Sequence, residues 1–439
     1  MTDTIYALSS GALPAGVAVI RISGPATAHM LRSLCGSVPG PRQATLRSIR
    51  NRNDDVLDQG LILYFKAPAS FTGEDCAELQ VHGGRAVVDA ILTELSDFPG
   101  SRHAEAGEFS RRAFHNGKLD LVEIEGLADL ISAETEMQRR LAQEHSSGNL
   151  SALYRGWAKR LTHARAMIEA ELDFADEDDV PGSVADRIWA DMRSLREEIT
   201  EHLVGAGMAE IIRDGLKIVI AGQPNAGKSS LLNRLARRDV AIVTEIAGTT
   251  RDVLSVDLSL AGFNVRLYDT AGLRETEDRV EQEGIRRAHM TIEQADVILL
   301  LADGPDDFAS LAQYEGLKPV LRVGTKIDRN PVLWDKAVAD VLISTVTDEG
   351  LDQLVGLLKR YLPDLSAKNA MALPSRRRHV NCLEQARSAI DMSLAQFNSG
   401  LDIQAEYLRQ AGDALGRITG RVDVEDLLDV IFSEFCIGK

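Results

Sequence analysis

Residues 222–229 read GQPNAGKS and come directly after the apolar stretch KIVIA (217–221). The spacing GxxxxGK[ST] between a strand and a helix is typical of a loop whose backbone N–H groups surround phosphate oxygens. In such a loop the ammonium group of Lys228 reaches the outer phosphates, and the hydroxyl of Ser229 can ligate Mg²⁺. A glycine-rich turn without a ligand is the weaker interpretation, because the motif stands between an expected strand and an expected helix. The sequence therefore predicts a site for a nucleoside triphosphate.

Two later segments are typical of the switch regions of a GTPase. LYDTAG (267–272) places Asp269 at the end of an apolar strand, on the Mg²⁺ side of the predicted site. TEIAGTTRD (244–252) offers Thr250 as a further Mg²⁺ ligand beside Ser229. Leucine follows DTAG at the position where Ras-like proteins carry a glutamine that orients the attacking water. Since leucine cannot orient water, hydrolysis would need another residue for that task and another source of positive charge.

Two base-contacting loops are expected further along the chain. TKID (325–328) is similar to the guanine-reading motif NKxD, with Thr325 in place of asparagine. The carboxylate of Asp328 can accept hydrogen bonds from the N1–H and 2-amino groups of guanine, so we expect selectivity for guanine. Because Thr325 replaces the asparagine, we expect a weaker affinity than that of the full motif. ISTVTDEG (343–350) supplies the last loop. The GTP-binding residues expected from all these segments are Asn225, Ala226, Gly227, Lys228, Ser229, Ser230, Thr244, Glu245, Ile246, Ala247, Gly248, Thr249, Thr250, Asp269, Thr270, Ala271, Gly272, Thr325, Lys326, Asp328, Ser344 and Thr345.

Length and charge limit the kind of protein. At 439 residues the chain is long for one core, so two or three domains are expected. The net charge of −17 lies in residues 119–439, because residues 1–118 carry equal numbers of basic and acidic side chains. Such a chain repels nucleic-acid phosphates except through local basic patches. No signal peptide or membrane span is expected, and the widely spaced cysteines favour reduced thiols in a cytoplasm: Cys35, Cys76, Cys382 and Cys436.

Hydrophobic periodicity divides the chain into four parts. Short β-rich runs with one helical stretch (84–95) predict an N-terminal α+β domain over residues 1–118. Helical period follows over 119–212, then strands alternate with helices over 213–368, and helical period resumes over 369–439. We expect a multidomain α+β and α/β protein, in which a doubly wound Ras-like P-loop domain is inserted into a helical domain.

Three segments outside the nucleotide motifs narrow the family: GEFSRRAFHNGKLDL (107–121), ELQVHGG (78–84) and the terminal FCIGK (435–439). With these segments, the whole chain resembles the bacterial tRNA-modifying GTPases of the MnmE (TrmE) family. The resemblance implies an N-terminal tetrahydrofolate-binding domain that forms a homodimer, and a location in the cytoplasm. It also implies an FAD-dependent partner, MnmG (GidA). With that partner, such proteins add a carboxymethylaminomethyl or aminomethyl group to C5 of the wobble uridine of certain tRNAs.

The resemblance also implies roles for particular residues around GTP. A potassium ion would be held by the Asn225 side chain and the backbone of Thr244 and Ile246, with Thr249 alongside. Its charge would replace the arginine finger of Ras-like enzymes. Glu281 matches the glutamate that orients the attacking water, and without the resemblance it would pass for a solvated helix-surface acid. The expected catalytic residues for hydrolysis are therefore Glu281 and Lys228, with Mg²⁺ and K⁺ as metal cofactors.

For the folate, which would be a 5,10-methylene- or 5-formyl-tetrahydrofolate, the resemblance carries over four residues. These are Arg21, Glu78, Lys118 and Lys439. Without the resemblance, Arg21 and Lys118 would be assigned as surface charges. Cys436 matches the family's candidate for one-carbon or uridine chemistry, and a small buried thiol that only packs is an equally weighted interpretation.

Two other functions remain open at this point. A potassium-loop GTPase of ribosome assembly would share Asn225 and the first switch segment, but such factors usually carry basic RNA-binding flanks. A folate-binding dimer with a vestigial GTPase is disfavoured by the intact phosphate and Mg²⁺ residues. The basic run SRRRH (375–379) could contact tRNA, although a solvated helix start is the favoured interpretation.

Overall fold

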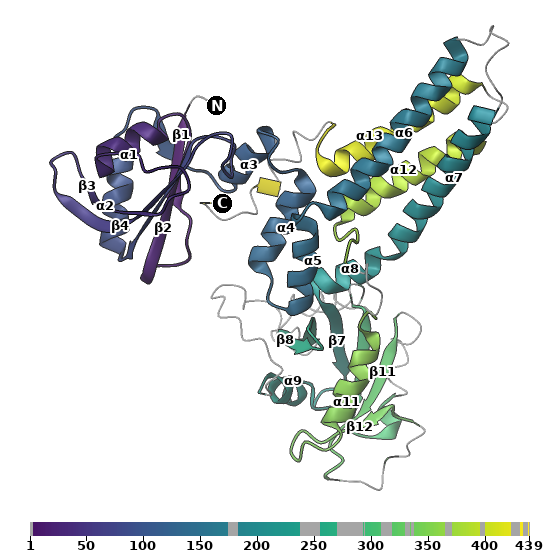
Figure 1. The fold of residues 1–439 in the computed structure, drawn as a ribbon. Coiled ribbons are helices and arrows are strands. Elements are labelled where there is room, and N and C mark those ends of the chain that lie inside the picture. The colour runs from purple at the N-terminus through teal and green to yellow at the C-terminus, as the bar shows by residue number, and fades with distance from the viewer. Residues whose placement is uncertain are drawn as a thin grey trace, which may run out of the picture. The chain divides into compact units, whose positions relative to one another are not determined.

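The computed structural model describes residues 3–173, 183–237, 255–269, 293, 295–308, 318–329, 334, 338–364, 371–395, 400–422, 431–432 and 438. The chain divides into two compact units (Figure 1). Unit 1 comprises Met1–Ala128, His145–Met192 and Ser388–Lys439, and unit 2 comprises Asp129–Glu144 and Arg193–Arg387. Residues 119–212, which were expected to belong to one helical domain, therefore contribute to both units.

The N-terminal part of unit 1 is a six-stranded mixed sheet with the strand order β3-β4-β5-β2-β1-β6. Alternating burial along the central strands places Ile20, Ile22 and Leu79 in a core beneath helices α1 and α2, while the residues between them face the other side. The strands are β1 (Thr4–Leu8), β2 (Ala15–Ser23), β3 (Thr45–Arg50), β4 (Val56–Phe65), β5 (Cys76–Gly83) and β6 (Ser101–His103).

Three helices accompany this sheet, where the sequence predicted one. The predicted helix is α2 (Arg85–Ser96), but α1 (Thr27–Cys35) and α3 (Glu108–His115) are helical too. Helix α1 has 9 residues and α3 has 8, and both are shorter than the window over which helical periodicity can be recognised. The prediction of a single helix in this region was therefore wrong.

Long helices form the rest of unit 1, with α6 (Asn149–Asp173) packed along α13 (Leu401–Thr419). Helix α4 (Leu121–Ser132) begins with a capping box, in which the Asp120 and Glu123 side chains each accept the other's backbone N–H. Asp120 also accepts hydrogen bonds from Ser151 and Arg155 of α6. The start of α4 is therefore fixed to α6 by the same carboxylate that caps it.

Near the C-terminus, Ile431 and Phe432 pack against Leu121 and Ile124 of α4. The Phe432 side chain is fully buried, and its backbone lies so close to Gly107 that a Cβ at that glycine would meet the Phe432 carbonyl at 2.7 Å. These contacts place Ile431 and Phe432 in a core with α4.

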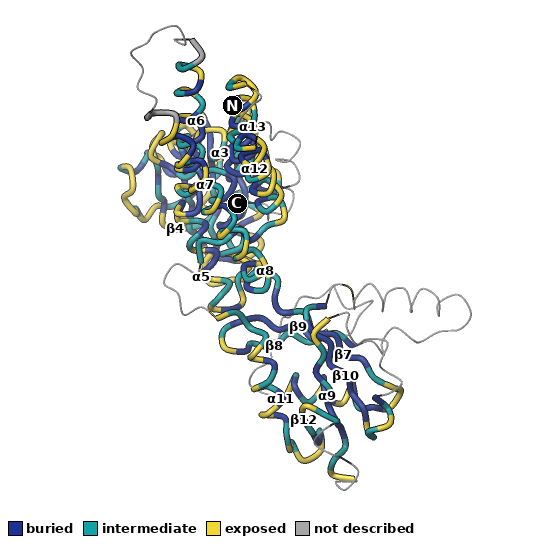
Figure 2. The backbone as a smooth tube through the Cα atoms, turned by 90° about the vertical axis from the view of Figure 1, so that its right-hand side faces the viewer, coloured by how far each residue is buried: buried dark blue, intermediate teal, exposed yellow. Residues whose placement is uncertain are grey.

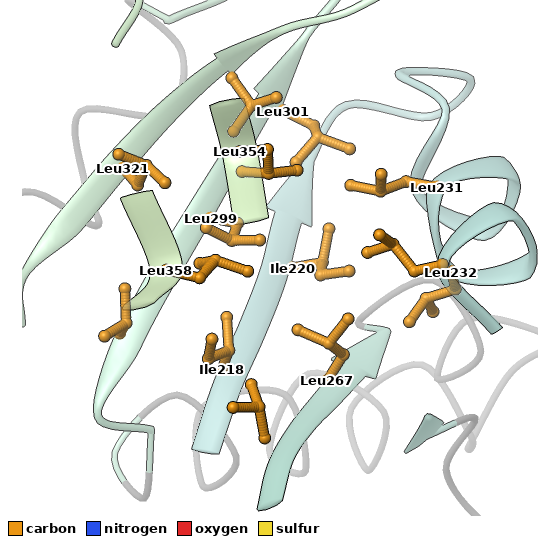
Figure 3. Packing of buried hydrophobic residues seen from close by; sticks show 14 of the residues in the cluster. Ile218, Ile220, Leu231, Leu232, Leu267, Leu299, Leu301, Leu321, Leu354 and Leu358 are labelled. Atoms are coloured by element: carbon orange, nitrogen blue, oxygen red, sulfur yellow. The ribbon is translucent and has the colours of Figure 1, made fainter. Parts of the chain in front are cut away.

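Unit 2 contains a second six-stranded sheet, with the order β12-β11-β10-β7-β9-β8. All neighbours pair in parallel except the β8–β9 hairpin. Leu231 and Leu232 of α9 and Leu354 of α11 pack on one face of this sheet (Figure 3). Strand β10 is buried along its whole length (Figure 2), as is typical of a parallel strand covered on both faces. The elements are β7 (Leu216–Gly222), α9 (Lys228–Ala236), β8 (Ser255–Leu260), β9 (Phe263–Asp269), β10 (Val297–Ala302), β11 (Val320–Gly324), β12 (Val341–Leu342), α11 (Leu351–Leu358) and the 3₁₀-helix η4 (Lys359–Tyr361).

The turn of the β8–β9 hairpin docks on α5 (Glu136–Ser146) within unit 2. The Met137 backbone N–H, in the first helical turn, donates to the Gly262 carbonyl at 3.1 Å. Phe263 packs in a core with Leu141 of α5 and Ile212 of α8 (Ala206–Asp214). The hairpin therefore satisfies a backbone donor that the first turn of a helix leaves without an intrahelical partner.

The basic run 375–379 differs from its prediction. Helix α12 (Arg377–Ala395) begins inside it, but Ser375 and His379 are buried, and Arg376 forms an ion pair with Asp129 at 2.7 Å. A solvated helix start is thus correct only for part of the run. Helix α7 (Ser183–Val204) completes the described helices, none of which is long and apolar enough to cross a membrane.

Replacing Phe432 with alanine tests the packing of the last segment. We expect Phe432→Ala to lower the free energy of unfolding by about 3–5 kcal/mol, because it removes a fully buried ring and leaves a cavity. Urea denaturation followed by circular dichroism measures this loss. Ile403→Ala on α13, at a side chain that is 41% exposed, is the control and should change stability by less than about 0.5 kcal/mol. Equal losses in both variants would contradict the burial of Phe432.

Candidate functional sites

The predicted phosphate loop lies between the end of β7 and the start of α9. Asn225 and Gly227 have φ angles of 67° and 93°, a left-handed conformation that turns the backbone around the loop. Lys228 is the first residue of α9, and its ammonium group donates to the carbonyls of Gly222 and Gln223 at 2.8 and 2.9 Å. The loop thus holds the cation at its centre, at a helix N-terminus that has no side-chain cap.

Two of the residues predicted around Mg²⁺ lie in direct contact. The Ser229 hydroxyl on α9 donates to the carboxylate of Asp269, at the end of β9, over 2.9 Å. Asp269 is 1% exposed. A hydroxyl and a carboxylate are oxygen ligands of the kind that Mg²⁺ prefers, so the donor set fits this ion. The third predicted residue of this group, Thr250, lies outside the described residues.

The two predicted base loops are also brought together. The Ser344 hydroxyl donates to the Asp328 carboxylate at 2.7 Å, and it accepts the backbone N–H groups of Val346 and Thr347. Ser344 therefore orients the carboxylate that is expected to read guanine. Thr325 is 3% exposed, and its hydroxyl contacts the carbonyl of Ala226 in the phosphate loop at 2.9 Å. The first base loop is thus tied to the phosphate loop.

Sequence reasoning missed two ion pairs that support these loops. Arg234 of α9 binds the Asp348 carboxylate through two of its nitrogens, and Asp348 belongs to the second base loop. Lys326 binds Asp303 at 2.6 Å, just beyond the end of β10. No local pattern could have shown the first pair, since its partners are 114 positions apart. Lys326 was assigned to the GTP site from its motif, but its partner was not.

A second group of predicted residues lies on the N-terminal sheet, on the face opposite α1 and α2. Arg21 of β2 and Glu78 of β5 are directly paired across the strands, and their side chains form an ion pair at 2.9 Å. The guanidinium group of Arg21 lies 5.4 Å from the ring centroid of Phe71 and 5.7 Å from that of Phe109. This arrangement gives a partly exposed cation and anion with aromatic walls.

The other predicted folate residues are not all placed. Lys118 is exposed, and its ammonium group donates to the Pro68 carbonyl at 3.1 Å. Gly438 accepts a hydrogen bond from the Ser9 hydroxyl at 2.7 Å, just after β1. Of the remaining site residues, the following lie outside the described part of the chain: Thr244, Glu245, Ile246, Ala247, Gly248, Thr249, Thr250, Thr270, Ala271, Gly272, Glu281, Cys436 and Lys439.

Comparisons with known proteins cover the whole chain. The family model "GTP-binding protein TrmE N-terminus" matches residues 4–118, and the model "MnmE helical domain" matches residues 121–436. A protein of Sinorhizobium medicae named tRNA modification GTPase MnmE is 70% identical over 440 residues, which cover 100% of this chain and 99% of the relative. A protein of Rhizobium meliloti with the same name is 69% identical over 438 residues, with the same coverage of both chains.

Among solved structures, the G domain of the T. maritima FeoB iron transporter matches 34% of this chain and 99% of its own length, with 24% identity and a TM-score of 0.27. A likeness this low adds nothing to the assignment. The relatives and the family models agree with one another, and together they cover the length of the chain. The chain belongs to the MnmE (TrmE) family of tRNA modification GTPases.

Proposed function

We propose that this chain hydrolyses GTP in the modification of tRNA, and that it adds a carboxymethylaminomethyl or aminomethyl group to C5 of the wobble uridine together with an FAD-dependent MnmG (GidA) partner. The observation that carries the proposal is full-length family membership combined with an assembled nucleotide site. That site holds Lys228, the Ser229–Asp269 contact and the Asp328 carboxylate at one edge of the sheet. Proposed domains are 1–118 for folate and dimerisation, 213–368 for GTP, and 119–212 with 369–439 for the helical domain.

The described residues support binding and orientation of GTP with Mg²⁺. Lys228 would exchange its two loop carbonyls for phosphate oxygens, and Ser229 with Thr250 would ligate the Mg²⁺ that neutralises phosphate charge. Asp269 accepts a hydrogen bond from Ser229 and so fixes the orientation of this ligand. Asp328, held by Ser344, would accept hydrogen bonds from N1–H and the 2-amino group of guanine.

A potassium ion would supply positive charge beside the transferring phosphoryl group, where Ras-like systems use an arginine finger. The proposed ligands are the Asn225 side chain and the backbone of Thr244 and Ile246, with Thr249 alongside. Asn225 lies in the turn of the phosphate loop with a positive φ, which suits asparagine better than most side chains. Glu281 is the proposed residue that orients the attacking water.

The N-terminal sheet is the proposed folate site of a homodimer. The Arg21–Glu78 pair offers one cation and one anion on the same face. A pterin presents hydrogen-bond donors that suit a carboxylate, and a glutamate tail presents carboxylates that suit Arg21, Lys118 and Lys439. Cys436 is the proposed reactive thiol, with simple packing as the other interpretation.

The potassium proposal predicts a strong dependence of turnover on the monovalent cation. GTP hydrolysis should be about a hundredfold faster in KCl than in NaCl at matched ionic strength, because a transition-state charge is left unmatched without the ion. Asn225→Ala should lose this stimulation and still bind GDP. Gln223→Ala, in the same loop, is the control and should keep the stimulation. Steady-state phosphate release and fluorescent GDP titration measure both properties. Equal rates in the two salts would exclude the potassium mechanism.

The role of Glu281 predicts a defect in turnover without a defect in binding. Glu281→Ala should lower kcat by about 10²–10⁴, the usual contribution of a positioned general base, and leave the Kd for GTP unchanged. Glu283→Ala, two positions away, is the matched control and should keep its activity. Single-turnover hydrolysis measures the effect, and a similar loss in both variants would assign it to the segment and not to Glu281.

The folate proposal predicts a separate loss on the N-terminal sheet. Arg21→Ala should weaken binding of 5-formyl-tetrahydrofolate about tenfold to a hundredfold, because it removes a charge-assisted contact worth about 1.5–3 kcal/mol. GTP hydrolysis should not change, and Arg50→Ala at the edge strand β3 is the control. Isothermal titration calorimetry on the full-length protein measures the folate affinity of both variants. Unchanged affinity in Arg21→Ala would mean that folate binds elsewhere.

A further inference from the structure

The proposed recognition of guanine depends on the orientation of one carboxylate, that of Asp328. Thr325, which replaces the asparagine of the usual motif, directs its hydroxyl at the carbonyls of Ala226 and Ala302, at 2.9 and 3.1 Å. A hydroxyl has only one proton to donate, and here it lies against carbonyls of the protein. The orientation of Asp328 therefore decides whether the N1–H and 2-amino donors of guanine are both matched.

Ser344 holds this carboxylate, and it belongs to the second base loop (343–350). Its hydroxyl donates to Asp328 at 2.7 Å and accepts the backbone N–H groups of Val346 and Thr347 at 3.2 and 3.1 Å. Ser344 is fully buried. A shift of the loop would therefore move the Ser344 hydroxyl and turn the carboxylate that it holds.

Both ends of the second base loop are fixed to the sheet. At its start, the Ile343 N–H donates to the Gly324 carbonyl at 2.7 Å. At its end, Gly350 has a φ of 75° and lies so close to the Leu342 carbonyl that a Cβ there would collide with it. The stretch between these ends includes Asp348, which extends to a different element.

An ion pair fixes the middle of the loop to α9. The Arg234 guanidinium, in the last turn of α9, donates through Nε and Nη2 to the two carboxylate oxygens of Asp348. Such a two-point contact fixes the relative orientation of its partners as well as their separation. Asp348 has a φ of 66°, a conformation that aspartate and asparagine adopt more readily than most residues. The turn therefore accommodates this side chain.

We propose that Arg234 and Asp348 are positioning residues for guanine: their ion pair holds the second base loop so that Ser344 orients Asp328 toward the base. This inference rests on the proposed guanine site and deepens it. Helix α9 begins at the phosphate loop with Lys228 and ends beside the base loop. The pair thus connects the helix that follows the phosphate loop to the loop that orients the base-reading carboxylate.

A second ion pair of the same kind supplies the matched control. Arg266 of β9 donates through Nε and Nη2 to the carboxylate of Asp257 on β8, at 2.7 and 3.0 Å. Both arginines are partly exposed, 39% for Arg234 and 36% for Arg266. The control pair lies in the β8–β9 hairpin of the same unit and contacts neither base loop in these bonds. Its removal reproduces the loss of a two-point ion pair without the proposed effect on guanine.

The first test needs no nucleotide. Arg234→Gln and Asp348→Asn should each speed hydrogen exchange of the Val346 and Thr347 amides in the full-length protein about fivefold, because the loop loses its contact with α9. Asparagine at position 348 keeps the turn, since it also tolerates a positive φ. Arg266→Gln should leave these amides unchanged. Unchanged exchange in both variants of the Arg234–Asp348 pair would overturn the inference.

The second test measures selectivity for guanine. Inosine diphosphate (IDP) lacks the 2-amino group, so it can form only one of the two hydrogen bonds to Asp328. Two bonds need a fixed carboxylate, whereas a single bond can follow one that has moved. Arg234→Gln and Asp348→Asn should therefore each lower the ratio of the Kd for IDP to the Kd for GDP about fivefold, and Arg266→Gln should keep it. Competition titration with fluorescent GDP measures both constants.

Kinetics and a double variant separate positioning from a general loss of stability. In Arg234→Gln and Asp348→Asn, KM for GTP should rise while kcat stays within about twofold of the wild type, because neither residue contacts the phosphates in this assignment. The double variant should be no worse than either single variant, since both changes remove the same contact. A less stable domain would bind GDP and IDP more weakly to the same extent. An unchanged ratio would therefore overturn the positioning role.

The variant Asp328→Asn tests the guanine site itself. If it keeps the wild-type preference for GDP over IDP, the proposed guanine site is wrong, and the inference that rests on it is wrong too. If Asp328→Asn loses this preference while Arg234→Gln and Asp348→Asn keep it, only the positioning role fails. Loss of the preference in all three variants is the expected result.

Discussion

The parallel pairing of β9, β7, β10 and β11 determines how the main parts of the proposed nucleotide site lie relative to one another. The register places Asp269 opposite Ile220 and Gly222 opposite Leu301, while Gly324 ends β11 opposite Ala302. The predicted phosphate loop, the Asp269 carboxylate and the predicted first base loop thus leave the sheet at one edge, the carboxyl ends of the strands, where open α/β sheets bind ligands. A slip of one residue in β9 would turn Asp269 to the opposite face of the sheet and separate it from Ser229.

The N-terminal sheet is organised around a different constraint, the cost of burying the Arg112 charge. A buried guanidinium is stable only when carboxylates pair with it. Arg112 binds Glu108 of its own helix α3, and Asp3 and Glu74 from two other parts of the chain. Asp3 and Glu74 therefore hold the chain just before β1 and the connection between β4 and β5 against α3. Glu74 belongs to the connection between β4 and β5, which also carries Phe71. This cluster therefore helps to place the aromatic ring beside Arg21 in the proposed folate site.

Several arginines of this chain, whose net charge is −17, are paired with carboxylates among the described residues. In unit 1, Arg155 binds Asp120 and Arg160 binds Asp191, while Arg376 of unit 2 binds Asp129. Each of these cations has its carboxylate within the same unit. Charges that are matched in this way attract phosphates less than free ones do. Contact with tRNA would then depend on residues beyond these pairs or on the proposed partner protein.

How much of the molecule the sequence could predict depends on how far apart the cooperating residues lie. The phosphate loop was predictable because its chemistry is contiguous: glycines, Lys228 and Ser229 stand within eight positions, and adjacent apolar runs indicate the strand and helix. Family resemblance added Arg21 and Glu78 to the predicted site residues, but it did not indicate the side chains that hold them in place. Arg112 and Asp3 are 109 positions apart, and Arg234 and Asp348 are 114 apart, so no local pattern marks either pair.

The short helices α1 and α3 were missed for a related reason, since 8 or 9 residues give too few turns to show a period. In α3, burial of Arg112 follows from tertiary contacts with the distant carboxylates, and a charged residue on an amphipathic helix would otherwise be placed on its solvent face.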